Sequence, residues 1–163
     1  MIILAIDPGT EKSGYVIIES KNLKVLEAGV IGNHDLIYMI KTIGREVEVL
    51  AIEMIASYGM AVGQSTFETC VWIGRFIQEF DANLSHFVYR KDVKIYLCNS
   101  MKAKDANIRQ AIIDKYPASG GGKIPQIGTK KQPGPLYGVS SHAWSALAVG
   151  ITFLESTIML EEV

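Results

Sequence analysis

Two carboxylates at the ends of apolar runs are the side chains of this sequence best suited to metal chemistry. Asp7 ends the run 2–6 and precedes the turn-forming Pro8-Gly9, and Glu53 ends the run 49–52. If the two runs form neighbouring parallel strands, both carboxylates leave the same edge of a sheet. Close carboxylates repel unless they share a proton or a cation, and hard divalent cations prefer oxygen ligands. The pair predicts a divalent-metal site, although acidic turn residues and strand-terminal glutamates are also common without a function.

A histidine in the last predicted helix is the third candidate. His142 lies near the start of an alanine-rich segment, residues 139–154, and Ser145 follows three residues later on the same helix face. A neutral imidazole can bind a metal or accept a proton, and the first turn of a helix would place it at the edge of the sheet. A single histidine at a helix start is more often a surface residue, so only the two carboxylates favour a role for His142.

The elements that must position these residues are mostly strands in the first part of the chain and helices in the second. Strands are predicted over residues 2–7, 14–18, 24–31, 49–52 and 87–89. The first three are too close together for helical crossovers, so they predict a three-strand antiparallel meander. Helices are predicted over residues 35–47, 63–80, 106–116 and 139–154, with a helix or turn over 92–98. Residues 117–138 hold six glycines and four of the five prolines, which predicts a long loop.

Length and composition fit one α/β domain over residues 1–163, because 163 residues that are 48% hydrophobic can form one full core. No apolar run reaches the roughly 20 residues that span a bilayer, and the N-terminal residues lack the features of a secretory signal. We therefore expect a cytoplasmic protein without a membrane partner. Cys70 and Cys98 are too few for a disulfide framework.

The net charge of −1 hides a strong asymmetry along the chain. Residues 90–131 contain ten basic and three acidic residues, a net charge of +7. The remaining six basic and fourteen acidic residues sum to −8. A segment of this kind can supply a basic surface for a polyanion, although clustering in the sequence need not produce clustering in space.

The chemistry-bearing residues belong to three longer motifs. These are Asp7-Pro8-Gly9-Thr10, Ala51-Ile52-Glu53 and His142-Ala143-Trp144-Ser145-Ala146-Leu147-Ala148. In order and rough spacing they resemble the RuvC-type Holliday junction resolvases, and the resemblance covers nearly the whole chain. Two further segments look more like the phage-encoded branch of that family, Gly128-Thr129-Lys130-Lys131 and Pro133-Gly134-Pro135-Leu136-Tyr137-Gly138. The resemblance implies an RNase H-like mixed five-stranded sheet, a homodimer, and Mg²⁺- or Mn²⁺-dependent cutting of four-way and other branched DNA.

The resemblance also implies roles for individual residues. Asp7 and Glu53 match the first two acidic ligands of the family, which would hold two metal ions per active site, and Glu53 would also orient the attacking water. His142 falls where the family uses Asp or His and would complete a metal shell or act as a general base. Ser145 falls where cellular members usually have Asp. The missing ligand would then be replaced by His142 with a water molecule, by a nearby acid such as Asp105, or by Ser145 itself as a poorer ligand.

DNA contacts follow from the same resemblance. The candidates for binding backbone phosphates are Lys102, Lys104, Arg109, Lys130 and Lys131. Tyr58 and Met60 are candidates for an apolar wedge at the centre of the junction. We expect no small-molecule cofactor.

Two alternatives remain open at this stage. A protein of the same fold could bind branched DNA without cutting it, since Ser145 is a poor ligand for a hard cation. The phosphate loop of sugar kinases and actin-like ATPases also begins with an acidic strand end followed by Gly-Thr. Those proteins need two related domains to enclose a nucleotide, and this chain has length for one.

Overall fold

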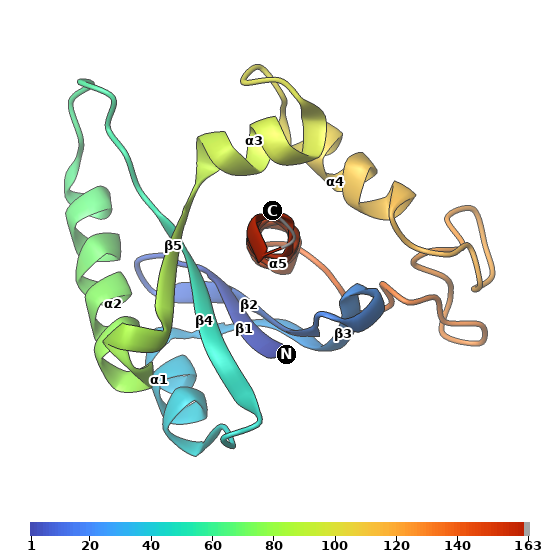
Figure 1. Ribbon diagram of the computed structural model, residues 1–163, viewed down its shortest axis with the longest axis horizontal. Coiled ribbons are helices and arrows are strands. Elements are labelled where there is room, and N and C mark those ends of the chain that lie inside the picture. Colours follow the sequence, from blue (N-terminus) through green and yellow to red (C-terminus); the bar gives the residue numbers. More distant parts are fainter. Residues whose placement is uncertain (162–163) are drawn as a thin grey trace.

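A mixed five-stranded sheet lies between two layers of helices in the computed structural model, which describes residues 1–161 (Figure 1). The strands are β1 (Ile2–Asp7), β2 (Lys12–Glu19), β3 (Lys24–Gly32), β4 (Val47–Met54) and β5 (Ser85–Tyr89). Their order is β3-β2-β1-β4-β5, in which β1, β2 and β3 are antiparallel and β1, β4 and β5 are parallel. The predicted meander and parallel strands are confirmed. The last two residues of the predicted domain, 162 and 163, lie outside the described residues.

Five α-helices and two short 3-10 turns complete the fold. The helices are α1 (Asn33–Thr42), α2 (Gln64–Phe80), α3 (Arg90–Cys98), α4 (Asp105–Asp114) and α5 (Ala143–Glu161). The turns are η1 (Lys21–Leu23) and η2 (Ala82–Leu84). Helices α1 and α2 cover one face of the sheet, whereas α5 crosses the other face with α3 and α4 packed beside it (Figure 1). None of the helices within residues 1–161 is long and apolar enough to cross a membrane.

Side-chain alternation along β1 decides which residues face which layer. Ile3 and Ala5 belong to the buried cluster that includes α5, whereas Leu4 and Ile6 belong to the cluster formed with α1 and α2. Helix α5 approaches closely because it presents Gly150, where an added Cβ would lie only 3.1 Å from the Cβ of Ala5. Asp7 is two residues beyond Ala5, so its side chain leaves β1 on the same face and points toward the α5 side of the sheet.

Three predicted helix boundaries were wrong. The last helix continues to Glu161, beyond the predicted end at residue 154. The helix predicted to run to Val47 ends at Thr42, because Ile43 adopts an extended conformation and Val47 already begins β4. Val47 continues the apolar spacing of α1 because α1 and β4 both pack residues into the same hydrophobic cluster. The last helix begins at Ala143 rather than 139, since Ser141 has a φ of 50°, while Val139 is buried as part of the loop. His142 therefore precedes α5 instead of lying within its first turn.

The predicted loop contains no helix or strand over residues 115–142 apart from one isolated bridge between Gly128 and Pro133. It is held together by backbone hydrogen bonds of its own, such as Gly120 N to Pro125 O at 2.8 Å and Gly134 N to Ile127 O at 2.9 Å. The loop leads directly into His142, so its internal order helps to place that residue.

Candidate active site

Asp7 and Glu53 lie side by side at the carboxyl ends of β1 and β4. In the parallel register Ile6 is the partner of Ile52, so the two acidic residues are the next pair at the rim. Glu53 is two residues beyond Ala51, which faces α5, just as Asp7 is two residues beyond Ala5. Each carboxylate therefore faces the same side as the alanine before it. The structure therefore brings together the two carboxylates that the sequence pairs, on the α5 side of the sheet.

His142 completes this group from the other side of the rim. Its Nδ1 lies 3.0 Å from Asp7 Oδ2, and its imidazole is 69% exposed while the Asp7 side chain is only 17% exposed. The contact depends on Gly14, which is opposite Asp7 in β2, because a Cβ there would lie 2.3 Å from the His142 carbonyl oxygen. In the neutral tautomer whose Nδ1–H donates to Asp7, the other ring nitrogen, Nε2, has a free lone pair.

The two carboxylates have unusual acidities because they are close and partly dehydrated. Burial raises the pKa of Glu53 to about 7, the Asp7 charge adds to the rise, and Arg90 opposes it. Burial also raises the pKa of Asp7, against the hydrogen bond and charge of His142 and the charge of Arg90. Each pKa also reflects a hydrogen bond between the two carboxyl groups. A cation bound between them would offset the repulsion between the two negative charges.

A buried polar network fixes the turn that carries Asp7. Ser13 and Asn33 are 1% and 2% exposed, and the Ser13 hydroxyl donates to Asn33 Oδ1 at 2.7 Å. The Gly9 N–H donates to Ser13 Oγ at 3.2 Å, and Asn33 Nδ2 donates to the Gly9 carbonyl at 2.9 Å. Both polar groups of the Gly9 backbone are thus held from β2 and α1, two residues after Asp7. Sequence patterns did not identify this network, because Asn33 contacts Ser13 and Gly9 from 20 and 24 positions away in the chain.

We predict that Asn33→Ala loosens this turn. The change removes the hydrogen bonds that Asn33 forms with the Ser13 hydroxyl and with the Gly9 carbonyl, and both groups lose this partner. The free energy of unfolding should therefore fall by about 1–3 kcal/mol. Loss of a group that orients a ligand should also weaken Mn²⁺ binding by about 10–100-fold. Urea denaturation and titration with Mn²⁺ measure the two effects. Gln78→Ala, at an exposed position of α2, is the control, and an unchanged Mn²⁺ affinity in Asn33→Ala would contradict the positioning role.

The donor set at this rim fits a hard divalent cation. Two carboxylates lie on adjacent strands with an imidazole against one of them, which is chemistry that Mg²⁺ and Mn²⁺ accept. Within residues 1–161, however, no group of three or more His, Cys, Asp or Glu residues is already arranged to hold a metal ion. Asp7 and Glu53 would therefore be the primary ligands.

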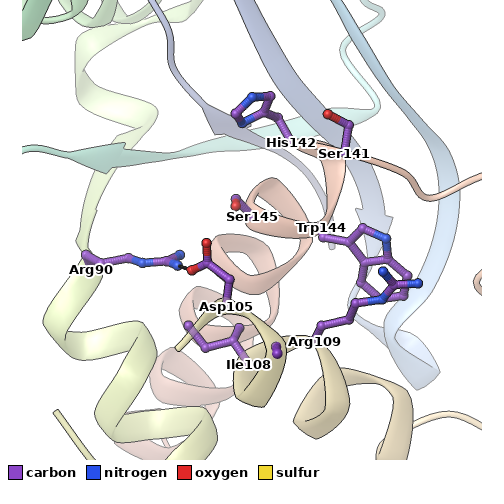
Figure 2. Close-up of a pocket in the computed structure, with 9 residues that line it drawn as sticks. Arg90, Asp105, Ile108, Arg109, Ser141, His142, Trp144 and Ser145 are labelled. Carbon is purple, nitrogen blue, oxygen red and sulfur yellow. Dashed lines mark hydrogen bonds and ion pairs between the residues drawn. The ribbon is translucent and has the colours of Figure 1, made fainter. Parts of the chain in front are cut away.

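A cavity of about 480 Å³ lies between α4 and the start of α5, and Arg90 and His142 are among the residues that line it (Figure 2). Asp105 and Ser145 both line it, together with His142. Asp105 does not face the metal ligands as a free acid, because its carboxylate forms an ion pair with Arg90. On the same wall, the Arg109 guanidinium lies 4.7 Å from the centre of the Trp144 ring.

Arg90 was not identified from the sequence; its place directly after the predicted strand 87–89 is the one local signal for it, and the position of that strand in the sheet comes from the structure. Arg90 directly follows Tyr89, the last residue of β5, and β5 is the third parallel strand of the sheet. The adjacent parallel strands β1, β4 and β5 thus end at the same rim, where they carry Asp7, Glu53 and Arg90.

The other predicted DNA contacts lie on exposed parts of the chain. Lys102 and Lys104 are exposed in the connection before α4, and Lys130 and Lys131 are exposed in the long loop. Tyr58 and Met60 lie between β4 and α2 with exposures of 60% and 71%, and Lys91 lies over the Tyr58 ring at 5.9 Å. The connection that carries Tyr58 and Met60 projects beyond the end of β4 (Figure 1). All of these side chains are exposed, and their contacts with DNA stay predictions.

No protein-family model matches this chain, and a search of curated proteins finds no relative. Solved structures do match. RuvC of T. thermophilus in complex with a Holliday junction substrate has a TM-score of 0.70 at 16% identity, covering 98% of this chain and 96% of that one. A Thermus thermophilus RuvC structure has a TM-score of 0.66 at 17% identity, covering 97% of this chain and 96% of that one. The mixed sheet flanked by helices is therefore the RNase H-like fold, as the sequence predicted, and the likeness to RuvC is established at the level of the fold.

Proposed function

We propose that this protein is a divalent-cation-dependent endonuclease that cuts four-way and other branched DNA. The observation that carries the proposal is the pair of partly buried carboxylates, Asp7 and Glu53, held at one rim with His142 against Asp7. The fold supports it, because the RuvC structure with a TM-score of 0.70 is a complex with a Holliday junction substrate. The nucleotide-binding alternative has no comparable support.

The residues of the rim suit phosphodiester hydrolysis. A bound Mg²⁺ or Mn²⁺ would polarise a phosphoryl oxygen and lower the pKa of a water molecule. Asp7 and Glu53 would bind the cation, and Glu53 would also orient the attacking water. In the reaction the water oxygen bonds to phosphorus, the P–O3′ bond breaks, and the exposed His142 Nε2 accepts a proton from the water. Solvent supplies the proton that the leaving 3′ oxygen takes up.

The test of this function is cleavage of a synthetic four-way junction, compared with linear duplex of the same sequence. We expect cleavage with Mg²⁺ or Mn²⁺ and none with EDTA, and we expect the junction to be cut in preference to the duplex. Tight junction binding without cleavage in either metal would instead favour the non-catalytic branched-DNA-binding protein. Binding of a nucleotide without affinity for DNA would favour the kinase-like alternative.

The basic segment would hold the backbone of the DNA. Lys102 and Lys104 precede α4, which lines the same cavity as His142, so phosphates approaching the rim would pass close to them. Because each phosphate contact releases counterions, replacing both lysines by alanine should reduce the salt dependence of binding. The slope of log K against log salt should become shallower by about 2. Fluorescence anisotropy over a salt series measures it, and an unchanged slope would remove these lysines from the interface.

Helix α2 offers a surface for a second copy of the chain. Phe67 and Val71 are four residues apart on one face and are 61% and 63% exposed, unlike Ile73 and Phe76, which are buried against the sheet. Large apolar side chains grouped on one helix face are typical of an interaction surface. We therefore place the homodimer contact on this face. Two copies would present two active sites to one junction, which suits paired cuts.

Val71→Asp should convert this dimer into monomers. A carboxylate at a two-fold contact loses apolar burial and faces its own copy, so dimer affinity should fall by about 100-fold or more. Light scattering after size exclusion measures the mass at a series of concentrations. Leu84→Asp, which is 46% exposed but lies outside α2, is the matched control and should remain dimeric. A dimer that persists in Val71→Asp would place the contact elsewhere.

A further inference from the structure

Arg90 gives the rim a fixed positive charge next to the two candidate metal ligands. In the parallel register Glu53 is the partner of Val88 and Met54 of Tyr89, so Arg90 is the first residue beyond the paired rim. Its guanidinium is close enough to act electrostatically on both Asp7 and Glu53. A permanent cation therefore lies near the two partly buried carboxylates, in addition to the His142 imidazole that contacts Asp7.

The guanidinium also faces the cavity in which Ser145 lies. Arg90, Asp105 and Ser145 line the same space, with Arg90 and Asp105 pointing toward one another (Figure 2). Ser145 contributes a neutral hydroxyl, so this wall offers a poor ligand for a second hard cation. The only acid among the residues that line this cavity, Asp105, is engaged by Arg90.

The charges at the site match one divalent ion better than two. Asp7 and Glu53 carry −2 when ionised, and Arg90 is offset by its partner Asp105 in the absence of DNA, so the sum is −2 with His142 neutral. One divalent cation brings this sum to zero. A second would leave two positive charges in a partly dehydrated site, which is unfavourable even after the single negative charge of a phosphodiester is added.

Arg90 is also free to contact a phosphate. The side chain of its partner Asp105 is 87% exposed, so this ion pair is weak and Asp105 can turn into solvent when a phosphate approaches. A guanidinium presents five N–H donors, more than the Asp105 carboxylate can use, and its planar fork suits two phosphate oxygens. Its own side chain is only 30% exposed, which limits the directions in which it can point.

We propose that Arg90 takes the place of the second metal ion of a two-ion centre, so that each chain binds one divalent cation and holds the scissile phosphate with this guanidinium. The proposal rests on the nuclease function above and differs from the two ions per site that the sequence resemblance implies. Asp105 is then the counter-ion of Arg90 in the absence of DNA. It is not the missing metal ligand.

Counting bound Mn²⁺ by electron paramagnetic resonance tests this inference without relying on activity. We expect one ion per wild-type chain at saturation and two in Arg90→Gln/Ser145→Asp, which removes the cation and adds a carboxylate. Arg45→Gln, an exposed arginine before β4, is the matched control and should keep one ion and full cleavage. Arg90→Gln alone should still bind Mn²⁺ but cut the junction at least about 100-fold more slowly, with Arg90→Lys between it and wild type.

The outcomes separate this inference from the proposed function. Two ions per wild-type chain, with junction cleavage intact, would overturn the role of Arg90 and leave the nuclease standing. One ion in both wild type and the double variant, with unchanged cleavage by Arg90→Gln, would also overturn it. No bound ion and no cleavage by the wild-type chain would overturn both.

Discussion

Asp7→Asn should reduce junction cleavage by about 10³-fold or more while leaving junction binding within a few-fold of wild type. The substitution keeps the shape of the side chain but removes the charge at the point where β1, β4 and His142 meet. An amide is a much weaker ligand for a hard divalent cation than a carboxylate, so metal binding is lost, while the amide oxygen can still accept the hydrogen bond from His142 Nδ1. The basic residues proposed to hold the DNA are untouched.

Single-turnover cleavage with Mg²⁺ and with Mn²⁺ measures the loss, and anisotropy measures binding in EDTA. Asp35→Asn, at an exposed position in the first turn of α1, is the matched control and should cut at the wild-type rate. Asp7→Asn should also unfold at a higher temperature than wild type in EDTA, because it removes a charge whose burial is unfavourable. Full cleavage by Asp7→Asn would refute the proposed active site.

The free energy of unfolding should fall as the pH rises from about 4.5 to about 7 in metal-free buffer. Glu53 has an ordinary pKa of 4.5 that is raised to about 7 in the folded protein, so the folded state binds more protons than the unfolded state in this window. Stability therefore decreases as pH increases through it, by at most about 3 kcal/mol from Glu53. The raised pKa of Asp7 contributes with the same sign.

Urea denaturation in EDTA across this pH range measures the slope. Glu53→Gln should flatten most of it and should be more stable than wild type at pH 7 and above, although it should not cleave DNA. Glu46→Gln, an exposed glutamate before β4, should keep the wild-type slope. A saturating divalent cation should also flatten it, because the cation replaces the proton between the two carboxylates. A stability that rises from pH 4.5 to 7 would contradict the buried pair.

Much of the fold could be predicted because its strands are short apolar runs bounded by turn residues, and successive residues of any strand face opposite sides of the sheet. This alternation sends Ile3 and Ala5 to one side and Leu4 and Ile6 to the other, and it extends to Asp7. Boundaries were less accurate where one apolar pattern crosses two elements. Val47 continues the spacing of α1 but begins β4, and Val139 continues the spacing of α5 but is buried as part of the loop.

The sequence by itself determined the chemistry available to this protein: acidic strand ends at Asp7 and Glu53, a nearby histidine, and the alternation that turns both carboxylates to one face. These features are local, because strand period and turn residues depend on near neighbours. Only the tertiary structure decided that Arg90 reaches the same rim, that Asp105 is paired with it, and that Asn33 holds the Asp7 turn. These contacts join residues 15 to 83 positions apart, and the order of strands in the sheet, which no local pattern encodes, brings them together.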